Sequence, residues 1–143
     1  MVQELVVYPD DRVNIACTDV RTFDEKLFGV LENMRDTMEA NNLKALSAIQ
    51  IAYPYNIILV KTAEGYDEYI NPRMIGKEGL FDSVEQTVYY PNITQTIPRY
   101  KKIKLIYEDR TGKAQHADID DPELTSTIQR KLDYLFEIGR AHV

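Results

Sequence analysis

Apolar residues recur at spacings of three and four along the segment after Thr22, a pattern that predicts an amphipathic helix. Thr22 and Glu25 have the order of a capping box, because each side chain can accept a hydrogen bond from a free N–H at the helix start. Asparagines at positions 41 and 42 suit the helix end, since Asn tolerates the left-handed conformation. The apolar face consists of Leu27, Val30, Leu31, Met34 and Met38.

A second helix is predicted towards the end of the chain. Asp121 can cap it, and Pro122 suits its first position. Glu123 is favourable beside the positive end of the helix dipole. The apolar stripe consists of Leu124, Ile128, Leu132 and Leu135.

Between the helices the pattern changes to short β-rich runs. Residues 57–60 are continuously apolar, which is typical of a buried strand. Residues 102–107 alternate between lysine and apolar side chains, as a half-exposed strand does. The other candidate strands in this region are residues 69–70 and 87–90, and residues 4–8 form a further candidate before the first helix.

Two turns separate these runs. Asn71 and Pro72 predict a turn after the strand at 69–70, and residues 109–112 predict another, with Gly112 able to adopt an unusual φ. A helix, several short strands and a second helix predict an α+β fold. No repeat or linker is present, so we expect one domain over residues 1–143.

The composition excludes several classes of protein. The 143 residues are 44% apolar and 28% charged, as in an ordinary globular chain. The net charge of −6 gives no electrostatic support to nucleic-acid binding. The single cysteine fits a reducing compartment, and no apolar run approaches the ~20 residues that cross a bilayer. We therefore expect a soluble, cytoplasmic protein with no membrane contact.

Residues that commonly bind metals are few. Cys17, His116 and His142 are far apart in the sequence, so they do not form a zinc-ligand pattern. The chain also has no glycine-rich phosphate loop and no nucleophile elbow.

Eight segments in order along the chain resemble the peptide deformylase family. Three of them correspond to the family motifs G-L-A-A-x-Q-I-G, E-G-C-L-S-x-P and Q-H-E-x-D-H-L. The segments are residues 8–10 (YPD), 34–38 (MRDTM), 45–52 (ALSAIQIA), 71–72 (NP), 85–91 (EQTVYYP), 98–99 (PR), 109–113 (DRTGK) and 129–135 (QRKLDYL). The resemblance implies a deformylase-like α+β fold, with short antiparallel strands packed around the C-terminal helix.

The resemblance also implies a site. Members of this family remove the formyl group from the N-terminal methionine of new bacterial proteins, with a metal held by one Cys and two His. The corresponding positions here are Thr87, Arg130 and Tyr134. A threonine hydroxyl is a poor substitute for a thiolate, and a guanidinium repels a divalent cation. We therefore expect no metal and no other cofactor.

The remaining catalytic positions are partly retained. In the family a Glu acts as general base, and a Gln with a backbone N–H stabilises the oxyanion. Lys131 stands at the Glu position, whereas Gln50 and the backbone around Val88 are of the family type. Ala45 and Ala52 replace two glycines of the first motif, which reduces conformational freedom beside the groove.

Two interpretations of this remnant pocket compete. In the favoured one the pocket is filled by Tyr134 and by the tyrosines at positions 89 and 90, and Arg130 or Lys131 pairs with a nearby carboxylate. Glu85 and Asp133 are the candidate carboxylates. In the other, the pocket binds an anionic group such as a carboxylate.

We therefore expect a catalytically inactive deformylase-like protein that serves as a binding or regulatory module. Its ligand could be a peptide, an anion or a protein partner, and a link to the ribosome is implied by family analogy alone. The alternative is an active deformylase-type hydrolase, acting on formyl-methionine or another peptide with a non-standard site. The strong potential metal ligands for that alternative are Cys17, His116 and His142.

Overall fold

The computed structural model describes residues 1–6, 16–86 and 94–136. In these ranges the strands form one antiparallel sheet in the order β1-β2-β3-β4-β5. The elements in chain order are α1 (Glu25–Asn41), β1 (Ala45–Ser47), the 3-10 helix η2 (Ala48–Ile51), β2 (Ile57–Thr62), β3 (Gly65–Gln86), β4 (Thr94–Glu108), β5 (Ala114–Ile119) and α2 (Pro122–Phe136). This arrangement confirms the predicted α+β class.

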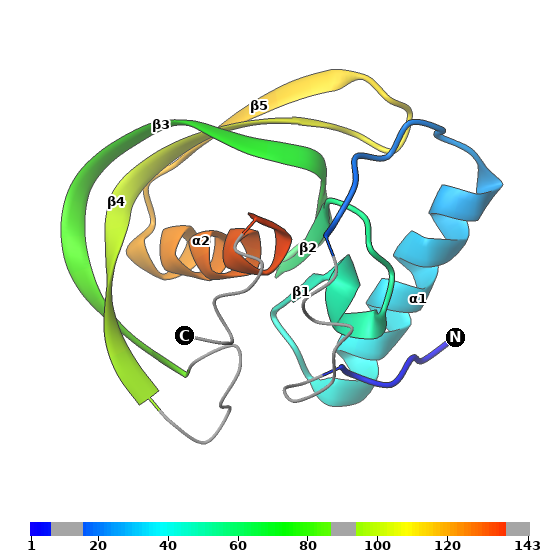
Figure 1. Cartoon of the computed structure of the whole chain (residues 1–143), viewed down its shortest axis with the longest axis horizontal. Coiled ribbons are helices and arrows are strands. Elements are labelled where there is room, and N and C mark those ends of the chain that lie inside the picture. The colour runs from blue at the N-terminus through cyan, green and yellow to red at the C-terminus, as the bar shows by residue number, and fades with distance from the viewer. Residues whose placement is uncertain (7–15, 87–93, 137–143) are drawn as a thin grey trace.

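The long β3–β4 pair curves around α2, as Figure 1 shows, while α1 lies on the other side of β1 and β2. The core has two apolar clusters, and β2 contributes to both. Ile57 and Leu59 pack in the cluster with α1, and Ile58 and Val60 pack in the cluster with α2. Because β2 is buried on both faces, its sequence is continuously apolar.

Both helices are confirmed, although the start of α1 differs from the prediction. The N-cap is Asp24, whose carboxylate accepts hydrogen bonds from the N–H groups of Lys26 and Leu27. The capping box of Thr22 and Glu25 is therefore wrong. The predicted end of the helix is confirmed, because Asn42 is the C-cap with a left-handed φ of 54°.

The turn predicted at Asn71 and Pro72 is wrong, because β3 continues through both residues. Asn71 has a φ of 54°, and the register with β4 shifts between Ile70 and Arg73. The Asn71 amide donates to the carbonyl of Val20 and accepts from its N–H, at 2.9 and 2.7 Å. The asparagine therefore forms a bulge that is tied to the segment before α1.

The remaining predictions for local structure have mixed outcomes. Strands β2 and β4 contain the predicted runs, and the turn at 109–112 is confirmed with Gly112 at a φ of 84°. Residues 4–6 of the first candidate strand are not in a strand, while positions 7–8 and the run at 87–90 lie outside the described residues. Strands β1 and β5 were not predicted. No helix in the described ranges is long and apolar enough to cross a membrane.

Candidate functional site

Gln50 and Lys131 meet where η2 packs against α2. Lys131 Nζ donates to Gln50 Oε1 at 3.1 Å, and the N–H of Ser47 donates to the same oxygen at 2.9 Å. Ser47 Oγ in turn donates to the carbonyl of Lys131 at 3.1 Å. Gln50 Nε2 makes no hydrogen bond to any described residue.

The 3-10 helix that carries Gln50 ends in an unusual backbone conformation. Ala52 is its C-cap at a φ of 66°, in the left-handed region that favours glycine. Ala52 therefore adopts a backbone conformation for which glycine is better suited. The loss of conformational freedom expected from the glycine-to-alanine replacement applies at this residue.

The amine of Lys131 is buried, with 8% of the residue exposed. Burial, and secondarily the positive charge of Arg130, lowers the pKa of Lys131 to about 7. The amine also lies 5.3 Å from the centre of the Tyr134 ring. Near neutral pH, both the ammonium and the neutral amine are therefore populated, and the neutral form can accept a proton.

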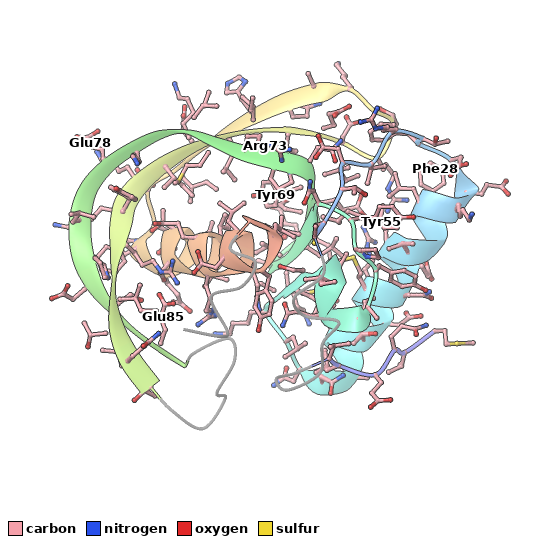
Figure 2. All side chains as sticks on the ribbon, viewed as in Figure 1. Phe28, Tyr55, Tyr69, Arg73, Glu78 and Glu85 are labelled. Carbon is pink, nitrogen blue, oxygen red and sulfur yellow. The ribbon has the colours of Figure 1, made fainter. Side chains whose placement is uncertain are left out.

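A buried ion-pair network joins β3, β4 and α2. Arg99 of β4 binds both carboxylate oxygens of Glu85, at 2.9 and 2.6 Å, and its Nη2 is also 3.0 Å from Asp133 Oδ2. Glu85 lies where the curved β3–β4 pair faces α2, as labelled in Figure 2. The predicted pairing of Arg130 or Lys131 with these carboxylates is therefore wrong, because Arg99 occupies both.

The network fixes the charge of its members. Burial alone would raise the pKa of Glu85, but hydrogen bonds from Arg99 and Ser83 and the Arg99 charge outweigh it, so that the pKa lies below its ordinary value. Glu85 is therefore a carboxylate at neutral pH. Through Arg99, which also contacts Asp133, it links β3 to α2.

A cavity of about 340 Å³ lies between the start of β1, the end of β3 and one face of α2. Its lining is mostly polar, and Tyr134 is not part of it. Positions 89 and 90 lie outside the described residues, so the interpretation of a filled pocket stays a prediction. The charged and hydroxyl side chains on the wall include Lys44, Glu85, Ser126, Thr127, Arg130 and Lys131.

Of the site residues that the sequence indicated, five lie in this region. Arg130 and Lys131 line the cavity with Glu85, and Lys131 connects it to Gln50 and Tyr134. Thr87 and Val88 lie outside the described residues. Sequence reasoning missed the roles of Arg99 and Ser47. The Pro-Arg pair at 98–99 was noticed as a resemblance, but nothing in the sequence alone showed which carboxylates the arginine binds.

The side chains that the resemblance assigns to the metal do not fit a divalent ion. Arg130 carries a permanently protonated guanidinium, and Tyr134 offers a phenol. Within the described ranges, no three residues among His, Cys, Asp and Glu are grouped so that they could hold a metal. Burial raises the pKa of Cys17 to about 11, and His116 is exposed on β5.

Comparison with known proteins shows which family these residues belong to. The family model described as polypeptide deformylase matches residues 2–139. Peptide deformylase from Campylobacter jejuni is 31% identical over 144 residues, covering 94% of this chain and 82% of the relative. Peptide deformylase from Syntrophomonas wolfei is also 31% identical, and the match covers 94% of this chain and 88% of the relative.

Solved structures share the fold. A crystal structure of a peptide deformylase from Legionella pneumophila has a TM-score of 0.87 at 23% identity, covering 94% of this chain and 81% of that one. The crystal structure of the Thermotoga maritima peptide deformylase has a TM-score of 0.85 at 23% identity, and the match covers 94% of this chain and 92% of that one. The deformylase-like fold expected from the resemblance is therefore confirmed.

These findings also correct the functional expectation. Proteins named as peptide deformylases match the chain along 94% of its length, and their family is one of metalloenzymes. The expectations of an inactive binding or regulatory module, and of a pseudoenzyme without a metal, are contradicted by that membership. The catalytic alternative agrees better with the findings, and the chain belongs to the peptide deformylase family.

Proposed function

We propose that this chain is a deformylase-type hydrolase, which removes the formyl group from the N-terminal methionine of a peptide, or from another formyl peptide, through a non-standard site. The family match and the relatives named peptide deformylase support the reaction class. The contact of 3.1 Å between Lys131 Nζ and Gln50 Oε1 is the observation that carries the site assignment. The family acts on newly made bacterial proteins, so the expected place of action is the cytoplasm.

Lys131 is the proposed general base. A lysine is an effective base near neutral pH only when burial lowers its pKa, which is the case for this amine. Its neutral form takes a proton from a water molecule as that water attacks the formyl carbon. The C–N bond then breaks, the proton passes to the leaving nitrogen, and the products are formate and a peptide with a free amino group.

Gln50 is the proposed oxyanion donor. Its Oε1 is held by the Ser47 N–H and by Lys131, which fixes the orientation of the amide. Its Nε2 has no protein partner among the described residues and can donate to the formyl oxygen as negative charge develops there. In this proposal, Lys131 removes a proton from the attacking water, and Gln50 stabilises the negative charge on the formyl oxygen.

The test is release of formate from formyl-Met-Ala-Ser by the purified full chain. We expect turnover that scales with protein concentration and falls by about 100-fold or more in Lys131→Met and in Gln50→Leu. Lys102→Met, which removes an exposed lysine of β4, serves as the matched control. Each protein is assayed alone, with a chelator, and with added Zn²⁺ or Fe²⁺.

The outcomes separate the alternatives. Release that persists in Lys131→Met but stops with the chelator would assign the reaction to a metal and contradict the role of the lysine. Absence of formate above background under all metal conditions would overturn the proposed function itself.

A further inference from the structure

The cavity beside α2 is lined by both cations and carboxylates. Lys44 and Glu123 on its wall are both exposed and pair with each other at 3.6 Å. Glu85, the other wall carboxylate, is bound through both oxygens by Arg99. Among the described residues, Arg130 and Lys131 are the wall cations without an ion-pair partner, and Arg130 lies close enough to Glu85 to lower the pKa of that carboxyl.

A hydroxyl group lies one helical turn from this guanidinium. Thr127 precedes Arg130 by three positions, and both line the same cavity. In the part of the chain that the structure describes, Thr127 Oγ1 makes no hydrogen bond, whereas the neighbouring Ser126 Oγ donates to the carbonyl of Glu123. A guanidinium with an adjacent hydroxyl donor is a suitable site for a carboxylate, because the charged donor strengthens each hydrogen bond.

Lys131 is shared by the cavity wall and the proposed reaction centre. This residue lines the cavity wall, and its amine contacts Gln50. A volume of about 340 Å³ is of the size of small ligand sites, and the mostly polar wall does not suit an apolar group. A group bound in the cavity would therefore lie against the wall that includes Lys131, the proposed base.

We propose that this cavity binds a carboxylate of the substrate, held by Arg130 and Thr127. The inference rests on the proposed function and defines its substrate class as formyl peptides that carry Asp or Glu near the formyl group. The acidic side chain can belong to the first or to the second residue of the peptide.

Paired substrates test the inference and distinguish the two positions. Formyl-Glu-Ala-Ser is compared with formyl-Gln-Ala-Ser, and formyl-Met-Glu-Ser with formyl-Met-Gln-Ser. Each pair differs by one charge at nearly constant size. We expect kcat/KM to favour the acidic peptide by about tenfold or more in one of the pairs. Equal values in both pairs would overturn the inference even if the peptides are hydrolysed.

Variants then assign the preference to the cavity. Arg130→Met should abolish the acidic preference, and Thr127→Val should reduce it, as measured by the ratio of kcat/KM within each pair of peptides. Arg21→Met is the matched control, because Arg21 is exposed and does not line this cavity. A preference that persists in Arg130→Met would contradict the assignment to this guanidinium.

A binding measurement separates failure of this inference from failure of the proposed function. Calorimetry with N-acetyl-Glu amide and N-acetyl-Gln amide needs no turnover. Tighter binding of the Glu compound, lost in Arg130→Met but kept in Arg21→Met, would support the carboxylate site even if no peptide releases formate. Equal binding of the two compounds, together with no turnover, would overturn the inference as well as the proposed function.

Discussion

Lys131 Nζ and Gln50 Oε1 lie 3.1 Å apart although 81 positions separate the two residues in the sequence. The contact joins α2 to η2, and Ser47 reinforces it by donating from its hydroxyl to the carbonyl of Lys131. A buried amine beside an amide with an available N–H brings a proton acceptor and a hydrogen-bond donor to one place. The position that carries a glutamate in the family motif can therefore still supply a base.

The first prediction concerns the pH dependence of formate release. Because the neutral amine of Lys131 is the proposed base and its pKa is lowered to about 7, kcat/KM should rise with pH through about 7 and level off above it. Initial rates with formyl-Met-Gln-Ser between pH 5.5 and 9 measure the inflection. A rate that falls over this range would contradict the role of Lys131 as base.

Arg130 supplies an internal check on that assignment. Its charge contributes to the lowered pKa of Lys131, so Arg130→Met should move the inflection to higher pH. The control Arg21→Met should leave the inflection in place. A purely structural effect of the Arg130 substitution would change the rate without moving the inflection.

The second prediction concerns stability. The pKa of Lys131 is about 7 in the folded protein and about 10.4 in an unfolded chain, so the unfolded state binds more protons between these values. The contribution of Lys131 to the free energy of unfolding therefore rises with pH across this window. Below pH 7 the buried amine is charged and destabilises the fold.

The comparison with Lys131→Met isolates this contribution, since other groups titrate in the same range. The variant should be more stable than the native chain at pH 6, and its advantage should shrink as the pH approaches 10. Urea unfolding at several pH values measures both proteins. A stability difference that is constant with pH would show that the amine is not buried as described.

The third prediction concerns the ion-pair network. Arg99→Met leaves the carboxylate of Glu85 buried with 4% exposure and without its bidentate partner. We expect a loss of about 3–5 kcal/mol in the free energy of unfolding at pH 7, most of it recovered when Glu85→Leu is added. Lys61→Met, which breaks the exposed pair with Glu39, should lower the free energy of unfolding far less, because solvent screens an exposed pair.

The elements that could be predicted from the sequence are those that local patterns specify. The stripe from Leu27 to Met38 and the alternation in residues 102–107 directly report which positions face the core. The bulge at Asn71 could not be predicted in this way. Asn-Pro is a turn signal in isolation, but hydrogen bonds to Val20 and Glu108 hold the asparagine inside a continuing strand. Tertiary contacts therefore override the local preference.

For the candidate site too, local sequence motifs indicated the residues but not their tertiary contacts. The motif resemblance located Gln50, Glu85, Arg130 and Lys131, and the structure brings these residues into one region. The resemblance could not identify which side chains pair with each charged residue. Arg99 reaches Glu85 and Asp133 only because β4 curves over α2 (Figure 1). The lowered pKa of Lys131 likewise depends on burial, which a lysine in a polar stretch of sequence does not reveal.

The last prediction tests how the motif positions correspond to the family's metal ligands. Replacing Thr87→Cys, Arg130→His, Lys131→Glu and Tyr134→His restores the family residue types at all four positions. Positions 130 and 134 lie one turn apart on α2, so two histidines there can reach one ion, and a thiolate at 87 would complete the set. We expect this variant to bind Zn²⁺ more tightly than the native chain, as measured by calorimetry and by metal content after dialysis.

The matched control keeps Thr87 and Tyr134 and carries only Arg130→His and Lys131→Glu. It has one of the two histidines and should bind Zn²⁺ more weakly than the quadruple variant. A folded quadruple variant that binds Zn²⁺ no better than this control would contradict the assignment of positions 87, 130 and 134 to the metal, while the roles of Lys131 and Gln50 would still be judged by the formate assay.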